Sequence, residues 1–362
     1  MRIDTVARRA RDIAHAGLEL ADLCLEFDAL VRSSVDYAVA SWSTHDPATT
    51  LFTSCTMTGV PKDPEGEARL FACEFREDEP STYRSLITEG RTVAILSEVT
   101  GGELTQASRF RELFQPVGIT DELRAVLWAG GTAWGSATLL RAGGSFGARD
   151  GEYLSAIGPH AGDGIRLALL RAAARRPEAI DEPPGIVESR HDGSVIALTT
   201  PAQQWLDRGA LPLVTAVNVL AGAVRARRDW LGAASRVVLS DGCVLSLHGA
   251  AMTSDDYAVA VIVDRARPAE LRAMLVDAYA LTPRQREVLG YLLLGRSVSD
   301  VARILGISEH TANDHRKAIY QRMGVSTRSQ LAALLQSEQY DPRVWRDIPP
   351  SPYGGFLEPS AG

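Results

Sequence analysis

The chain has 362 residues and a net charge of −7, and apolar and charged residues make up 45% and 23% of it. At about 150 residues per domain, this length predicts two or three domains. The composition is that of a globular protein and excludes a mostly disordered or fibrous chain. The negative charge argues against a surface built entirely for nucleic acid, although a single basic domain is compatible with it.

The sequence carries no pattern typical of a membrane anchor or a secreted protein. Apolar stretches such as residues 214–224 fall short of the about 20 residues that a membrane helix needs, and the charged N-terminus lacks the apolar core of a signal peptide. The histidines have no metal-ligand spacing, and no nucleophile is paired with a base. We therefore expect a cytoplasmic protein with no metal, no cofactor and no catalytic residues. Four cysteines without a C-x-x-C pair are expected to be buried apolar residues: Cys24, Cys55, Cys73 and Cys243.

Residues 1–174 are predicted to form a first domain of mixed helices and strands. Apolar spacing predicts helices over 18–31 and 150–174. Short β-branched or aromatic runs predict strands at 37–42, 49–54, 93–96, 123–128 and 134–140. Gly130-Gly131 predicts a hairpin turn between the last two strands. This layout, above all over residues 124–170, resembles a GAF-type sensor domain with an N-terminal helix.

A second domain is predicted over residues 186–265, after a charged, proline-rich linker at 175–185. It contains two predicted strand pairs at Asp-Gly turns, short helices from Pro201 and a last strand ending at Val263. This layout resembles a PAS-type fold. Three further assignments complete the chain: a connecting helix at 266–280, a third domain at 281–338 and a proline-rich, flexible tail at 339–362.

The third predicted domain is basic and helical. Between residues 281 and 335, eight basic residues oppose four acidic ones, which gives a local charge of +4 and suits a DNA-binding module. Thr282, Ser297 and Ser308 each precede a helical pattern and are predicted to be N-caps. Gly306 lies just before the third of these helices, and the short connection predicts a helix-turn-helix.

The third helix of this domain, from Ser308 to about Met323, has two predicted faces. Its inward positions are Ala312, His315, Ile319 and Met323, and its outward positions are His310, Asn313, Lys317 and Gln321, with Asp314 beside them. Asparagine can bond adenine, lysine can donate to guanine and aspartate can accept from cytosine. The positive N-terminus of the helix and the hydroxyls of Ser308 and Thr311 suit a phosphate.

Several of these residues allow two interpretations. For His315 we favour packing over a base contact. Asp314 can pair with His310 or Lys317 on the same helix face, or accept from cytosine, and both interpretations stay open. For Arg284 and Arg328 we favour phosphate contact over a solvated surface role.

Several motifs together resemble the LuxR-type (NarL/FixJ-like) DNA-binding domain. The residues that carry this resemblance are Leu281-Thr282-Pro283-Arg284-Gln285-Arg286-Glu287, Val301-Ala302, Leu305-Gly306-Ile307-Ser308 and Met323-Gly324-Val325. The resemblance implies a four-helix domain with its recognition helix in the major groove. It also implies a homodimer that binds inverted-repeat double-stranded DNA, with base contacts on Asn313, Asp314 and Lys317. Ala312, Asn313 and Asp314 depart from the usual family residues, so the family's operator sequence is not transferred.

The sequence thus predicts an α+β protein: GAF-like and PAS-like sensor domains followed by an all-α four-helix helix-turn-helix domain. The leading hypothesis is a sequence-specific transcription regulator whose sensor domains control DNA binding or dimerisation. The predicted DNA-binding residues are Thr282, Arg284, Ser308, His310, Thr311, Asn313, Asp314, Arg316, Lys317 and Arg328. The alternative is a sensor or dimerisation protein whose small-molecule effector binds the GAF-like domain. Trp42, Trp128 and Trp134 would then line the effector's pocket, and core packing is their other interpretation.

Overall fold

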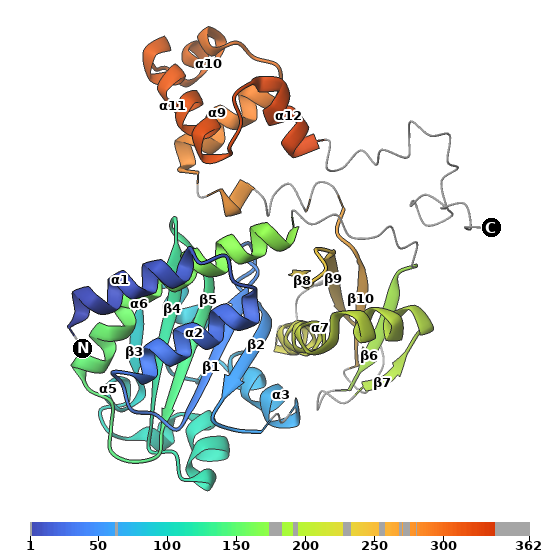
Figure 1. Cartoon of the computed structure of the whole chain (residues 1–362). Coiled ribbons are helices and arrows are strands. Elements are labelled where there is room, and N and C mark those ends of the chain that lie inside the picture. The colour runs from blue at the N-terminus through green and yellow to red at the C-terminus, as the bar shows by residue number, and fades with distance from the viewer. Residues whose placement is uncertain are drawn as a thin grey trace. The chain divides into compact units, whose positions relative to one another are not determined.

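The computed structural model describes residues 2–61, 64–173, 183–190, 195–226, 233–252, 258–267, 270, 276–279 and 281–336. Most of the predicted linker and connecting helix, and the whole predicted tail, lie outside these residues. The chain divides into two compact units, one built by residues up to Arg265 and one that begins at Ala266. The first unit holds two antiparallel sheets and the second is helical (Figure 1).

The first sheet has the order β2-β1-β5-β4-β3, and all its neighbouring strands are antiparallel. Its strands are β1 (Val39–His45), β2 (Phe52–Thr58), β3 (Val93–Ile95), β4 (Asp121–Ala129) and β5 (Thr132–Arg141), so each overlaps a predicted strand. Gly130 and Gly131 join β4 to β5 with φ of 60° and 79°. Residues with a side chain rarely adopt these positive φ values, which explains why the predicted hairpin has two glycines at its turn.

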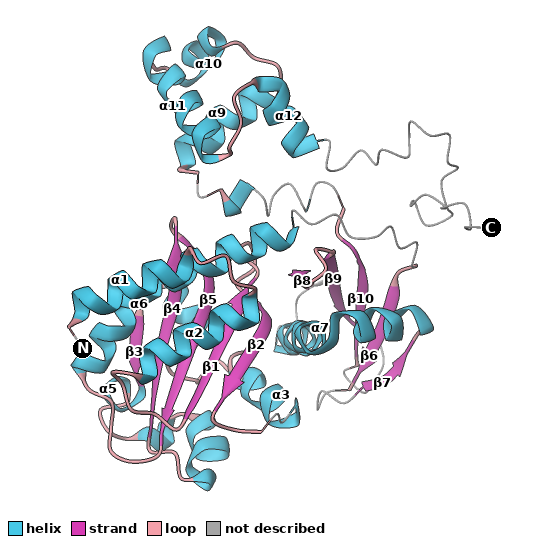
Figure 2. Cartoon of the chain, in the orientation of Figure 1, coloured by secondary structure: helices cyan, strands magenta, loops and turns pink. Residues whose placement is uncertain are grey.

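Three helices cover one face of this sheet (Figure 2): α1 (Ile3–Ala14), α2 (Leu20–Arg32) and α6 (Ala148–Ala173). The sequence did not predict α1, because only Val6, Ala10 and Ala14, spaced four apart, mark its buried face. The remaining helical elements are short: α3 (Pro64–Cys73), α4 (Tyr83–Thr88), α5 (Leu96–Val99), η1 (Leu104–Gln106), η2 (Phe110–Phe114) and η3 (Gln115–Val117). We call residues 2–173 the first sheet domain.

The second sheet, in residues 183–265, repeats the same topology with the order β7-β6-β10-β9-β8. Its strands are β6 (Gly185–Ser189), β7 (Val195–Leu198), β8 (Ala233–Val238), β9 (Val244–Ala251) and β10 (Val259–Arg265). We call this region the second sheet domain. Helical structure begins near Pro201, as predicted, in α7 (Thr200–Ala226), which follows β7. Its arms, Thr200–Gly209 and Leu213–Ala226, meet at 118°.

The core of the second sheet domain forms between α7 and the sheet. Trp205, Leu220, Leu245 and Val261 are fully buried there. Among the described residues, no individual helix has the length and hydropathy needed to span a bilayer, and α7 meets that test only when its two bent arms are combined.

Candidate nucleic-acid interface

The helical unit contains the four predicted helices of the third domain. They are α9 (Pro283–Leu293), α10 (Val298–Leu305), α11 (Glu309–Arg322) and α12 (Arg328–Gln336). Their common core consists of side chains that are at most 4% exposed: Val288, Leu289, Leu292, Val301, Ala302, Ala312, Ile319, Met323, Leu331 and Leu335. The burial of these apolar side chains away from water holds the four short helices together.

Reciprocal hydrogen bonds begin the first two of these helices. At α9, Gln285 N donates to Thr282 Oγ1 at 3.2 Å, and Thr282 N donates to Gln285 Oε1 at 3.0 Å. Ser297, a predicted N-cap, forms the same capping box with Asp300 at α10. The role of Gln285 was not predicted, although a Thr three residues before a Gln is the usual signature. Thr282 therefore has a structural function at the start of α9.

The turn of the helix-turn-helix contains three residues, from Gly306 to Ser308. Gly306 has φ of +64°, where a side chain would strain the backbone. Ser308 Oγ accepts the Thr311 N–H at 3.0 Å and lies 2.8 Å from Thr311 Oγ1. Arg284 Nη2 donates to the Leu305 carbonyl at 2.7 Å and so fixes α9 against the end of α10. The turn and its neighbours set the direction in which α11 leaves α10.

The two predicted faces of α11 are confirmed. Ala312, Ile319 and Met323 are buried and His315 is half-buried, which agrees with packing for this histidine. The opposite face carries exposed polar and charged side chains at His310, Thr311, Asp314, Lys317 and Gln321, with Asn313 half-buried beside them.

The structure pairs Asp314 with His310. His310 Nε2 lies 3.4 Å from Asp314 Oδ2, and the two side chains are 85% and 54% exposed. Four residues separate them, so they lie one turn apart on the same helix face. A protonated His310 can therefore offset part of the negative charge that Asp314 would bring to DNA.

The predicted phosphate-binding arginines have partners inside the domain. Besides its bond to Leu305, Arg284 forms an ion pair with Glu287 at 2.5 Å. Arg328 Nη2 donates to the Leu292 carbonyl, and the Arg316 guanidinium lies 5.6 Å from the centre of the Tyr320 ring. Each guanidinium has five N–H donors, so these contacts leave donors over for a phosphate. Phosphate contact by these arginines stays a prediction.

A compact helical domain with a three-residue turn and a polar recognition face defines a helix-turn-helix DNA-binding domain. Residues 279–335 match the family described as "Bacterial regulatory proteins, luxR family", so the C-terminal part of this chain is a LuxR-family DNA-binding domain. The Transcriptional regulatory protein MctR of Rhizobium johnstonii is 45% identical over 47 residues, which are 13% of this chain and 22% of MctR. The chain thus spans about a fifth of the length of this relative.

Solved structures provide more distant similarities. A phycocyanobilin-bound GAF domain from a cyanobacterial phytochrome is 14% identical, with a TM-score of 0.35, over 47% of this chain and 97% of that one. SdiA of Escherichia coli is 12% identical, with a TM-score of 0.26, over 94% of this chain and 98% of that one. The assignment of the DNA-binding domain depends on residues 279–335 alone.

Two of the three predicted pocket tryptophans are fully buried. Trp42 is 1% exposed, and its Nε1 donates to Asp28 Oδ1 at 3.3 Å. Trp134 is also 1% exposed and donates to the Ala129 carbonyl. Trp128 is partly buried and packs against the cluster that contains Phe52. Trp42 and Trp134 therefore pack inside the first sheet domain.

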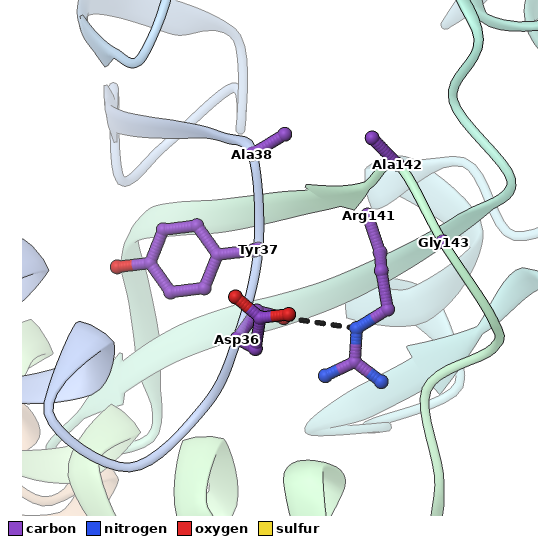
Figure 3. A pocket seen from close by; sticks show the side chains of 6 residues that line it. All are labelled: Asp36, Tyr37, Ala38, Arg141, Ala142 and Gly143. Atoms are coloured by element: carbon purple, nitrogen blue, oxygen red, sulfur yellow. Dashed lines mark hydrogen bonds between the residues drawn. The ribbon is translucent and has the colours of Figure 1, made fainter.

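A surface pocket of about 230 Å³ lies elsewhere in this domain, where β1 begins and β5 ends (Figure 3). Arg141 Nε donates to the Asp36 carbonyl at 2.9 Å across it. None of the three tryptophans is among its lining residues, which are Asp36, Tyr37, Ala38, Arg141, Ala142 and Gly143.

A buried ionic network in the first sheet domain was not predicted. Arg109 lies 2.6 Å from both Glu79 and Glu122, and Arg124 lies 2.9 Å from Glu122 and 2.7 Å from Glu74. Burial alone would raise the pKa of Glu122, but the two guanidinium groups beside it lower that pKa. The sequence signal for this network was the pair of charged residues two positions apart, Glu122 and Arg124, in the largely apolar strand β4. Among the described residues, no group of three His, Cys, Asp or Glu side chains could hold a metal ion.

Proposed function

We propose that the whole chain is a sequence-specific transcription regulator that binds double-stranded DNA through α11. The observation that carries this proposal is the luxR-family domain at residues 279–335, with its exposed polar face on the second helix of the helix-turn-helix. In such motifs the second helix enters the major groove and its N-terminal half contacts base edges. His310, Asn313 and Asp314 lie in that half of α11, and Lys317 lies just beyond it, one turn after Asn313.

Three side chains are proposed to read bases. Asn313 would bond adenine N6 and N7, Lys317 would donate to guanine and Asp314 would accept from cytosine N4. In the structure Asp314 lies beside His310, which is the pairing interpretation of this residue, and contact with cytosine is proposed in addition to it. An uncompensated carboxylate would repel the DNA backbone.

A second group of residues is proposed to position the domain on the phosphates. Ser308 and Thr311 lie at the positive N-terminus of α11, where free backbone N–H groups attract anions. The unused guanidinium donors of Arg284, Arg316 and Arg328 would contribute non-specific affinity.

The two sheet domains are proposed to act as the input and dimerisation part of the regulator. A homodimer would present two recognition helices to an inverted repeat, because the symmetry of the protein is matched by that of its operator. Binding of a small-molecule effector could change DNA affinity only by favouring one arrangement of the chain over another.

The test is operator selection by the full chain from random duplexes, followed by titration of the selected site and of each single-base variant. Asn313→Ala and Lys317→Ala are expected to lose about 1–3 kcal/mol of discrimination at the base that each contacts. Arg303→Ala is the control for charge, because its side chain is 76% exposed on α10. It is expected to leave the base preference unchanged. Equal affinity of the wild type for all duplexes would refute sequence-specific binding.

A further inference from the structure

A buried ion pair joins the two sheet domains. Asp46, directly after β1, is 2% exposed, and Arg236 of β8 lies 190 residues further along the chain. Asp46 Oδ2 accepts the backbone N–H of Arg236 at 2.7 Å and its Nε at 3.1 Å, and Asp46 Oδ1 accepts Nη2 at 2.7 Å. One carboxylate therefore receives three hydrogen bonds from a single residue of the other domain.

The backbone bond has a particular consequence because β8 is an edge strand. Among the described residues the second sheet has the order β7-β6-β10-β9-β8, so one side of β8 lacks a neighbouring strand within that sheet. Edge strands leave backbone N–H and carbonyl groups unpaired. Asp46 supplies the missing acceptor for one of these groups, and the first sheet domain thus covers part of the edge of the second.

The turn that contains Asp46 holds a strained residue. Thr50 has φ of +61°, a left-handed conformation that is unfavourable for a β-branched side chain. Two backbone hydrogen bonds impose it: Thr50 N donates to the Asp46 carbonyl at 2.7 Å, and Asp46 N donates to the Leu51 carbonyl at 2.9 Å. The residue that binds Arg236 thus also closes the strained turn.

Apolar contacts complete the junction between the domains. Leu51 packs against the core cluster of the second sheet domain and also against the cluster of the first that contains Phe52. Val219 of α7 is fully buried in that same cluster of the first domain. A carbon atom added at Gly222 would come within 3.2 Å of the Phe75 ring, so α7 and the first domain are in close contact there.

We propose that residues 46–51 form a conformational switch between the two sheet domains. In the closed state, which the structure shows, the Asp46–Arg236 pair is formed and Thr50 is strained. In the open state the pair separates, both charges become hydrated and Thr50 relaxes. Strain and the desolvation of two charges oppose closure, whereas the ion pair and the contacts of Leu51 and Val219 favour it. Because the ion pair and the strained residue both lie in residues 46–51, a substitution in this turn shifts the balance between the two states.

The test measures hydrogen exchange of backbone amides in the full chain, over β2 and β8. Thr50→Asn should favour closure, because asparagine tolerates a positive φ far better than threonine does. We expect exchange in β8, including the Arg236 amide, to slow by at least threefold. Asp46→Asn should favour opening and speed exchange at least tenfold in both strands.

Asp241→Asn is the matched control. It removes one charge from the Arg208–Asp241 pair, which lies within the second sheet domain at 2.6 Å. We expect this variant to leave exchange in β2 unchanged.

Unchanged or faster exchange in Thr50→Asn overturns the proposal, and so does an effect of Asp46→Asn that is confined to β2. Should Asp46→Asn fail to fold, the Thr50→Asn result decides alone. The measurement needs no DNA, so its outcome is independent of the proposed function.

Discussion

The buried histidine at the end of β1 makes the stability of the first sheet domain depend on pH. His45 is 1% exposed, and its Nε2 lies 2.9 Å from Ser136 Oγ. Its ring forms T-shaped pairs with Phe52 and Tyr83, and its Nδ1 has no hydrogen-bond partner among the described residues. Burial lowers the pKa of His45 from 6.5 to about 3.

The sign and size of the effect follow from proton linkage. Below pH 6.5 the unfolded chain binds a proton at His45, whereas the folded chain stays neutral there until about pH 3. The free energy of unfolding therefore decreases as the pH falls through this window, by about 1.4 kcal/mol per pH unit. At pH 5.0 the loss amounts to about 2 kcal/mol relative to pH 7.5.

Chemical denaturation of the wild type and of His45→Gln at pH 7.5 and 5.0 measures this loss. All other titrating groups are shared, so the change in unfolding free energy between the two pH values should be smaller in the variant by about 2 kcal/mol. Phe52→Leu is the control, because it disturbs the same ring cluster without removing a titrating group. It should lower stability equally at both pH values. The same pH dependence in His45→Gln as in the wild type would refute the reasoning.

Three further substitutions test other parts of the structure. Glu122→Gln leaves Arg109 and Arg124 without their shared carboxylate, and denaturation should show a loss of about 3 kcal/mol. Gly306→Ala places a side chain at φ of +64° and should destabilise the helical unit by about 1–2 kcal/mol in thermal unfolding, with Gly306→Asn costing less. Thr282→Ala removes a capping box and should cost that unit about 1 kcal/mol, measured by helical circular dichroism.

Each of these predictions has an outcome that contradicts it. Wild-type stability in Glu122→Gln would mean that the buried network contributes no net stabilisation. Equal stability of Gly306→Ala and Gly306→Asn would show that backbone strain is not the reason for this glycine. If Thr282→Ala loses DNA affinity without any loss of stability, its role is in binding DNA and not in capping α9.

The DNA-binding domain could be predicted closely because its features are local in sequence. The side chains of Ser297 and Ser308 accept hydrogen bonds from backbone N–H groups only three residues further along the chain. Gly306 forms the turn because glycine readily adopts a positive φ. The buried and exposed faces of α11 follow from a helical repeat of 3.6 residues. The strands of the first sheet were predictable for a similar reason, since short β-branched runs end at turn residues.

Contacts between distant residues could be found only from the folded chain. The sequence contains Asp46 and Arg236, but no local pattern relates two residues that are 190 positions apart. The assembly of Glu122 with Arg109 and the burial of Trp42 beside Asp28 likewise depend on how strands and helices pack. Side-chain periodicity and capping act within one helical turn or one strand pair. Burial and ion pairing act between whichever elements the fold brings together, so the junction between the sheet domains was decided by tertiary packing.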